Sequence, residues 1–169
     1  MIFFKIILLI SIVVASTLLG ILLSKKYSNR EKELKEMKSA LNIFATKIKF
    51  TYEPIPNVFL EIANKIEGNV GKIFARASNR MKEESAGEAW TNAFSDVPNN
   101  LSKEDTTILS NLGRMLGQTD VEGQISEIEV VVQFLNTQLE NAKQEKIKNE
   151  KMYRTLGIVG GLTIAIILI

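Results

Sequence analysis

Two apolar runs bracket a long polar stretch of the chain. Residues 2–23 carry one charge, Lys5, and residues 156–169 carry none. The first run matches the roughly 20 residues that a membrane-spanning helix needs. The second would rise only about 21 Å as a helix, against a hydrocarbon core of about 30 Å. The length alone therefore predicts an anchor for the first run, and for the second either an anchor or a buried core helix.

The residues beside each apolar run help to decide whether the run is a membrane anchor. Val14-Ala15-Ser16 would suit a signal-peptide cleavage site, but the length of the first run and the bases that follow it favour a retained anchor. Tyr27 lies just after the first run, and Tyr153 and Arg154 lie just before the second. A tyrosine beside basic residues is typical of a membrane boundary. We therefore predict that all three lie at the membrane interface and that the second run is also an anchor.

Between the runs, apolar residues recur at steps of three and four, the spacing of one helix face. Pro54 and Pro56 interrupt the pattern, because a residue before proline is pushed out of the helical region. The predicted helices are 31–51, 56–68, 70–82, 86–94, 103–116 and 121 into the C-terminal run. The predicted core faces are Leu34, Met37, Leu41, Phe44 and Ile48 on the first helix, and Ile125, Ile128, Val132, Leu135, Leu139 and Ala142 on the last.

Helix-start motifs support these assignments. Three pairs place an acid three positions after a hydroxyl residue, the spacing of a capping box. They are Ser85 with Glu88, Ser102 with Asp105, and Thr119 with Glu122. Gly117 is expected to end the helix that begins at residue 103, since glycine commonly follows the last turn of a helix.

The resulting fold class is all-α. We predict an antiparallel bundle of about six helices, with N- and C-terminal transmembrane helices continuous with its two longest helices. The predicted domains are 1–24 as the first transmembrane helix, 25–155 as a cytoplasmic helical bundle, and 156–169 as the second transmembrane helix. The cytoplasmic orientation follows from lysine and arginine, which flank both runs on the inner side of the chain.

Charge is uneven along the polar stretch. Residues 83–130 contain ten acids and only Lys103 and Arg114 as bases, whereas both segments next to the apolar runs are basic. The basic segments suit anionic lipid headgroups. The acidic part suits a basic protein partner and argues against nucleic acid. The candidate partner-binding residues are Glu83, Glu84, Glu88, Glu104, Asp105, Asp120 and Glu122.

Little in the sequence points to catalysis. The chain has no histidine and no cysteine, which removes the commonest general base, the thiol nucleophile and most zinc ligands. The adjacent carboxylates, such as Glu83 and Glu84, are best interpreted as solvated or capping groups. We expect no catalytic residue, no metal and no cofactor. Trp90 is expected to pack in the core with Phe94, in preference to a role as an exposed interface residue.

Small residues recur inside both apolar runs. Gly157 and Gly161 form a GxxxG pair, and Ser16 and Gly20 are spaced in the same way. Such spacing lets two helices approach closely in lipid, although short apolar segments also contain it by chance. A contact between the two runs and a chance occurrence are equally supported by the sequence.

Several segments together resemble the stage III sporulation protein AB family of endospore-forming bacteria. They include Tyr52 to Pro56, Gly87 to Trp90, Leu112 to Asp120 (LGRMLGQTD), and Glu145 to Gly161. The residues that match the family's pattern are Pro54, Pro56, Gly87, Trp90, Gly113, Gly117, Asp120 and Gln124. The glycines and Asp120 are more readily assigned to helix packing, termination or first-turn contacts than to binding.

The resemblance implies a function as well as a fold. The family's domain is similar to the helical domains of inner-membrane platform proteins of type II secretion and type IV pilus systems. It implies a non-enzymatic platform in a transenvelope complex between mother cell and forespore, in the mother-cell or outer forespore membrane. The implied partners are a secretion-type ATPase, stage III sporulation protein AA, and other stage III sporulation A proteins. A membrane-tethered adaptor or signalling scaffold is the alternative, and a homo-oligomer stays open.

Overall fold

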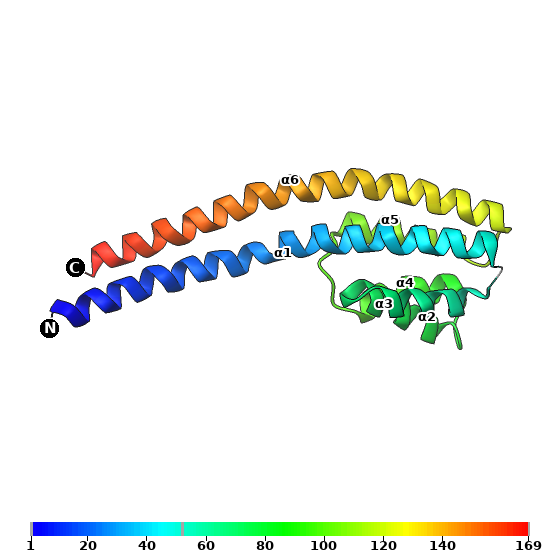
Figure 1. Cartoon of the computed structure of the whole chain (residues 1–169), viewed down its shortest axis with the longest axis horizontal. Helices are drawn as coiled ribbons and strands as arrows, with labels where there is room; N and C mark the ends of the chain where they lie inside the picture. The colour runs from blue at the N-terminus through cyan, green and yellow to red at the C-terminus, as the bar shows by residue number, and fades with distance from the viewer. Residues whose placement is uncertain (1, 52, 169) are drawn as a thin grey trace. The chain divides into compact units, whose positions relative to one another are not determined.

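The structure is a computed structural model that describes residues 2–51 and 53–168. Within these ranges it contains six α-helices and no strand (Figure 1), which confirms the predicted all-α class. The helices are α1 (Ile2–Phe50), α2 (Ile55–Lys65), α3 (Gly68–Arg80), α4 (Ala86–Asp96), α5 (Lys103–Leu112) and α6 (Val121–Ile167). Pro54 stands at the N-cap of α2 and Pro56 in its first turn, where its missing N–H costs nothing.

The contacts divide the chain into two compact units. One, the helix-pair unit, consists of the residues up to Glu31 together with those from Asn141 onward. The other, the bundle unit, is Lys32–Glu140. These limits follow packing, whereas the predicted limits after residues 24 and 155 follow polarity, so the predicted membrane boundaries stay a prediction.

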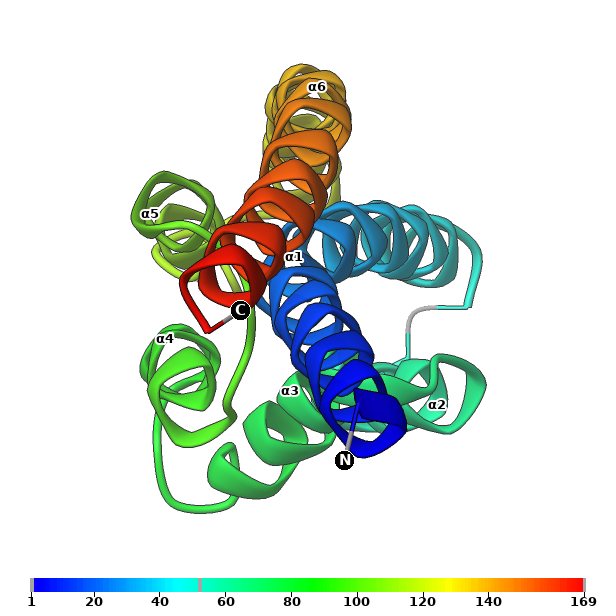
Figure 2. The ribbon, with the colours of Figure 1, turned by 90° about the vertical axis from the view of Figure 1, so that its left-hand side faces the viewer.

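An aromatic chain forms the centre of the bundle unit. The α2, α3 and α4 helices lie beside one another (Figure 2) and contribute most of it. Its members are Phe44 from α1, Phe59 from α2, Phe74 from α3, and Trp90 and Phe94 from α4, with neighbouring ring centroids 4.9–5.4 Å apart. Most of these ring pairs meet edge to face, the arrangement that aromatic quadrupoles favour.

The long helices present the predicted faces to this core. The whole predicted face of α1, from Leu34 to Ile48, is buried. On α6, Ile128 and Leu135 are buried, whereas Ile125, Val132 and Leu139 are only half-buried. Val131 and Gln138, which the prediction left out, are buried in their place.

A buried carboxylate ties three parts of the bundle unit together. Glu33 on α1 is 5% exposed. It accepts hydrogen bonds from Asn69 Nδ2 at 2.7 Å, and from Asn100 N and Nδ2 at 2.6 and 2.8 Å. A buried acid is tolerated when such donors satisfy its oxygens. Glu33 therefore fixes α1 against α3 and against the loop before α5.

Two details at the end of α5 and the start of α6 correct the predictions. The α5 helix ends at Leu112 and not at Leu116, and tight turns follow, such as Leu116 N to Gly113 O at 3.2 Å. Gly117 therefore does not end α5 as predicted; it lies five residues further on, with φ +73°, a conformation that suits glycine. The prediction of a capping box between Thr119 and Glu122 is wrong. Asp120 Oδ1 accepts from Gly123 N at 2.8 Å and caps α6 instead.

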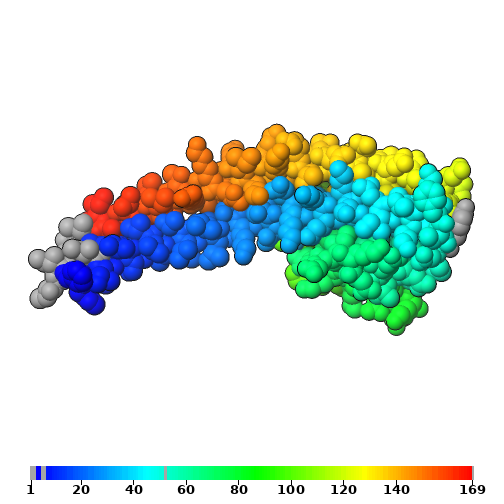
Figure 3. All heavy atoms as spheres, in the orientation of Figure 1, coloured from blue at the N-terminus to red at the C-terminus, as the bar shows by residue number. Residues whose placement is uncertain are grey.

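The helix-pair unit is held by close contact of small residues. Its two segments, the blue and red ends in Figures 1 and 3, lie against each other, and Ser16 Oγ donates to Gly157 O at 2.8 Å. A methyl group on Gly157 would lie 2.8 Å from Ser16 O, and one on Gly161 would lie 2.9 Å from Val13 Cα. The spaced small residues of the two apolar runs therefore form a real helix contact.

Polar pairs extend this contact beyond the apolar runs. Arg30 Nη1 lies 2.7 Å from Glu145 Oε2, and Lys146 Nζ lies 2.9 Å from Glu31 Oε2. The half-buried rings of Tyr27 and Tyr153 face each other with centroids 6.2 Å apart. Two of the three predicted interface residues thus meet, and Arg154 is exposed.

One helix passes a length and composition test for a membrane span. It is α1, whose apolar N-terminal part is mostly exposed. Among the described residues no second helix passes, because the apolar end of α6 is short and begins close to Lys151 and Arg154. The second anchor therefore stays a prediction.

Gly157→Ala is expected to loosen the helix pair, whereas Gly160→Ala is not. At Gly157 the added methyl meets backbone atoms, but at Gly160 the nearest atom is Ser16 Oγ at 3.8 Å. Overpacking typically costs about 1–3 kcal/mol, equivalent to a loss of the paired state by a factor of roughly 5 to 160. The chain has no cysteine of its own, so Tyr27→Cys with Tyr153→Cys allows one defined bismaleimide cross-link. Equal cross-linking in both alanine variants would contradict the contact.

Candidate partner-binding pocket

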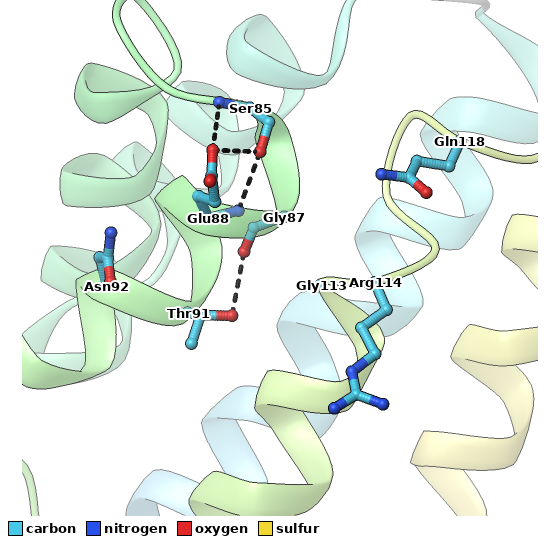
Figure 4. A pocket seen from close by; sticks show the side chains of 8 residues that line it. All are labelled: Ser85, Gly87, Glu88, Thr91, Asn92, Gly113, Arg114 and Gln118. Carbon is cyan, nitrogen blue, oxygen red and sulfur yellow. Dashed lines mark hydrogen bonds between the residues drawn. The ribbon is translucent and has the colours of Figure 1, made fainter.

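A polar pocket lies in the bundle unit between α4 and the segment that follows α5 (Figure 4). Its volume is about 360 Å³. The lining residues are Ser85, Gly87, Glu88, Thr91, Asn92, Gly113, Arg114 and Gln118. Most of these side chains are exposed, so the pocket is a shallow, open feature of the surface.

A capping box fixes the carboxylate at the edge of this pocket. Ser85 Oγ accepts a hydrogen bond from Glu88 N at 3.3 Å, and Glu88 Oε2 accepts from Ser85 N at 3.2 Å and from Ser85 Oγ at 2.7 Å. The bond from the Ser85 hydroxyl, followed by that from its amide, lowers the pKa of Glu88 below its ordinary value. Glu88 is therefore an ordered negative charge at neutral pH.

Two glycines allow α4 and α5 to come close enough to form the pocket. A methyl group on Gly87 would collide with the carbonyl of Gly113. One on Gly113 would lie 2.9 Å from Gly87 O and 3.1 Å from Thr91 Oγ1. Each glycine therefore faces the backbone of the other, and neither position has room for a side chain.

Trp90 fixes the same pair of helices from the core side. It is fully buried, and its Nε1 donates to Leu109 O on α5 at 2.6 Å. This confirms the prediction that Trp90 is a core residue. The pocket thus rests on a rigid floor, as a binding surface requires.

Charges of both signs lie at the pocket. Arg114 is exposed, and within the described residues it has no ion pair. Asn92 Nδ2 donates to Glu84 Oε2 at 3.0 Å, and Glu84 in turn pairs with Arg80. The pocket therefore offers a guanidinium, an ordered carboxylate and amide groups, which can bind a polar protein segment through hydrogen bonds and ion pairs.

The ion pairs of Asp96 with Arg76 and Arg80 should make the free energy of unfolding depend on pH. Arg80 and Arg76 both donate to Asp96 Oδ2, at 2.7 and 2.6 Å, and lower the pKa of Asp96 to about 2. A carboxyl group with a lowered pKa stabilises the fold above its unfolded pKa of 3.8, and this contribution is lost as pH falls toward 2. We expect the free energy of unfolding, measured by urea titration, to fall less between these pH values in Asp96→Asn than in the unchanged chain. An unchanged pH profile would contradict the assignment.

Sequence comparison places nearly the whole chain in a known family. The family model described as stage III sporulation protein AB matches residues 5–169. The chain belongs to the stage III sporulation protein AB family.

A relative and a solved structure from this family agree with the assignment. The stage III sporulation protein AB of Bacillus subtilis (strain 168) is 29% identical over 161 residues, which are 93% of this chain and 94% of the relative. A solved stage III sporulation protein AB structure matches with a TM-score of 0.64 at 21% identity. It covers 70% of this chain and 96% of the solved one, and supports the fold.

The residues of this chain that match the family's pattern converge in part. Gly87 and Gly113 form the pocket, Trp90 lies beneath it, and a methyl group on Gly117 would lie 3.8 Å from Ala86 Cβ. The others have structural contacts elsewhere. Asp120 caps α6, Gln124 Nε2 donates to Thr119 O at 3.0 Å, and Pro54 and Pro56 begin α2.

The acidic candidates separate into three groups. Asp105 is fully buried and accepts from Ser102 N at 2.8 Å, so its choice as a partner-binding residue was wrong. Glu84, Glu88 and Asp120 are held by internal hydrogen bonds. The remaining acids, Glu83, Glu104 and Glu122, are exposed and do not line the pocket.

Arg114 and Gln118 were missed as candidates, along with Thr91 and Asn92. The signal for Arg114 was present, because it is one of only two bases among the ten acids of residues 83–130. The other three are ordinary polar residues, and their place in the pocket depends on how α4 and α5 pack.

Proposed function

We propose that this chain is a non-enzymatic membrane platform component of a sporulation-specific secretion or channel complex between mother cell and forespore. In this proposal the bundle unit holds a secretion-type ATPase, stage III sporulation protein AA, near other stage III sporulation A proteins in the membrane. The family membership supports the sporulation role. The platform role and the named partners go beyond that membership.

The observation that carries the proposal is the convergence at the pocket. Gly87 to Trp90 and Leu112 to Asp120 are separate segments in sequence, and both contribute to one polar surface with a rigid floor. A shallow, open pocket that carries charges of both signs suits a protein partner better than a small molecule, whose pockets bury most of the ligand surface.

Membrane attachment is the second part of the proposal. The apolar part of α1 has the length of a span, and its small residues contact the apolar end of α6. We propose that both segments are anchors in the mother-cell or outer forespore membrane, with the bundle unit in the cytoplasm. The shorter segment can be accommodated by local thinning of the bilayer, at a fraction of a kcal/mol per Å of mismatch.

Crosslinked co-purification of the tagged full chain from sporulating cells tests the platform role. We expect a secretion-type ATPase in the eluate. Reversal of the three exposed acids, Glu83→Lys, Glu104→Lys and Glu122→Lys, is expected to reduce its recovery if the partner is basic. Glu67→Lys with Glu140→Lys is the control, because both acids are exposed and lie outside residues 83–130.

Two outcomes would contradict parts of the proposal. A chain that never recovers an ATPase would favour the membrane-tethered adaptor or scaffold over the platform. Equal recovery with the triple reversal and with the control would contradict docking on the acidic surface. It would leave the pocket as the remaining contact to be tested.

A further inference from the structure

A second hollow lies in the helix-pair unit, between α1 and α6. It is a groove of about 850 Å³ at the level where the apolar runs give way to charged residues. Its apolar walls include Ile21 from α1 and Ile158 from α6, and its polar end includes Glu150, Lys151 and Arg154. The groove therefore combines apolar walls with a cationic stretch beside them.

The apolar walls of the groove are poorly covered. Ile21 is 48% exposed and Ile158 is 38% exposed. Ile147, which precedes the charged residues on α6, is 63% exposed. The two helices touch next to the groove, where Gly20 meets the backbone of Tyr153. Small residues bring the backbones together there, and the larger side chains on either side leave a channel open.

The polar end of the groove carries a net positive charge. Lys151 and Arg154 line it opposite a single acid, Glu150. Both bases are exposed, and across the described residues neither forms an ion pair or a side-chain hydrogen bond. The nearby acids Glu31 and Glu145 are occupied by Lys146 and Arg30. Two cations are thus free to bind an anion at this point.

We propose that this groove binds one anionic phospholipid, with its phosphate between Lys151 and Arg154 and an acyl chain along Ile21 and Ile158. A guanidinium and an ammonium are the groups that proteins use for phosphate. An apolar wall directly beside them fits a molecule with a phosphate and a hydrocarbon chain, and a free phosphate would leave that wall uncovered. Tyr153 lies between the two bases in sequence, as expected at headgroup depth.

The bound lipid would have a structural consequence for the helix pair. It would cover the exposed isoleucines and neutralise the excess charge at the place where the two helices leave the apolar region. This inference rests on the membrane attachment proposed above and is independent of the ATPase. The two can therefore fail separately.

Native mass spectrometry of the full chain tests the groove. The protein is purified in detergent and mixed with equal amounts of phosphatidylglycerol and phosphatidylcholine. We expect preferential retention of one phosphatidylglycerol. Lys151→Gln with Arg154→Gln should weaken this preference about 30-fold, the effect of removing two cations from an anionic headgroup. Lys143→Gln with Lys148→Gln removes the same charge from exposed α6 positions outside the groove and should change it little.

Five results would overturn the proposal. Equal retention of both lipids would contradict headgroup recognition, and equal weakening by the two double variants would show only diffuse attraction to charge. Binding of inorganic phosphate as tight as that of phosphatidylglycerol would show a phosphate site that does not recognise the acyl chain. A chain that does not float with vesicles of the same two lipids would contradict membrane attachment itself, and the groove with it. A chain that floats without lipid preference contradicts only the groove.

Discussion

Trp90→Ala is expected to lower the free energy of unfolding by about 3–5 kcal/mol, the usual cost of truncating a buried tryptophan. Trp90 is fully buried and contacts Phe59, Phe74 and Phe94, with centroids 5.0–5.4 Å away. Alanine would leave a cavity among these rings. It would also leave the carbonyl of Leu109 without the hydrogen bond that it accepts from Nε1.

Trp90→Phe separates the two contributions. Phenylalanine retains most of the ring packing and loses the hydrogen bond, so a smaller loss of about 1–3 kcal/mol is expected. Urea unfolding of the full chain in detergent, followed by far-ultraviolet circular dichroism, measures both variants, since Trp90 is the only tryptophan and its fluorescence is lost. For Trp90→Ala, a loss smaller than that expected for Trp90→Phe would contradict its place in the core.

Gly87→Ala is expected to destabilise the chain by about 1–3 kcal/mol and to reduce partner binding. The added methyl collides with the carbonyl of Gly113, and backbone atoms cannot rotate away as a flexible side chain could. The helices must move apart, which widens the pocket. Alanine favours a helix over glycine by up to about 1 kcal/mol. A net loss of stability would therefore show that the collision with Gly113 outweighs this gain.

Ser95→Ala is the matched control for Gly87→Ala. Ser95 lies on the same helix and is exposed, so alanine there should leave stability unchanged or slightly higher. If the Gly87 and Ser95 variants unfold at the same urea concentration as the unchanged chain, the close approach of α4 and α5 is not required. The contact between Gly87 and Gly113 would then not be what maintains the pocket.

Local patterns in the sequence predicted the parts of the fold that depend on neighbouring residues. The buried face of α1 follows from the spacing of Leu34 to Ile48, and the caps at Ser85 and Ser102 follow from an acid three positions later. These features need only the geometry of one helix, which the sequence determines directly.

The features that sequence reasoning missed depend on residues far apart in the chain. In the sequence, Glu33 is indistinguishable from the other charged residues of a polar helix face. Its burial depends on hydrogen bonds from Asn69 and Asn100, which are distant in the chain. The α5 helix ends early, at Leu112, and Gly113 just beyond it faces Gly87. Likewise, Asp105 was chosen for its charge, although its position after Ser102 turns it inward to cap α5.

The same limit applies to the candidate pocket. Glu88 and the glycines were identified individually, but their meeting with Arg114 requires the packing of α4 against the end of α5. Charge counts suggested an acidic surface for a basic partner. The structure places one of the two bases of that region, Arg114, at the pocket, so a partner that fits the pocket must also offer an acceptor for a guanidinium.

Charge reversal inside the pocket tests the central claim most directly. Arg114→Glu and Lys103→Glu change the only two bases of residues 83–130 in the same way, and only Arg114 lines the pocket. ATPase recovery in crosslinked co-purification from sporulating cells is the measurement. We predict at least about a tenfold loss with Arg114→Glu, as for a charged contact worth roughly 1.4 kcal/mol, and near-normal recovery with Lys103→Glu. Equal recovery of the ATPase with both variants would contradict the pocket as the partner-binding site.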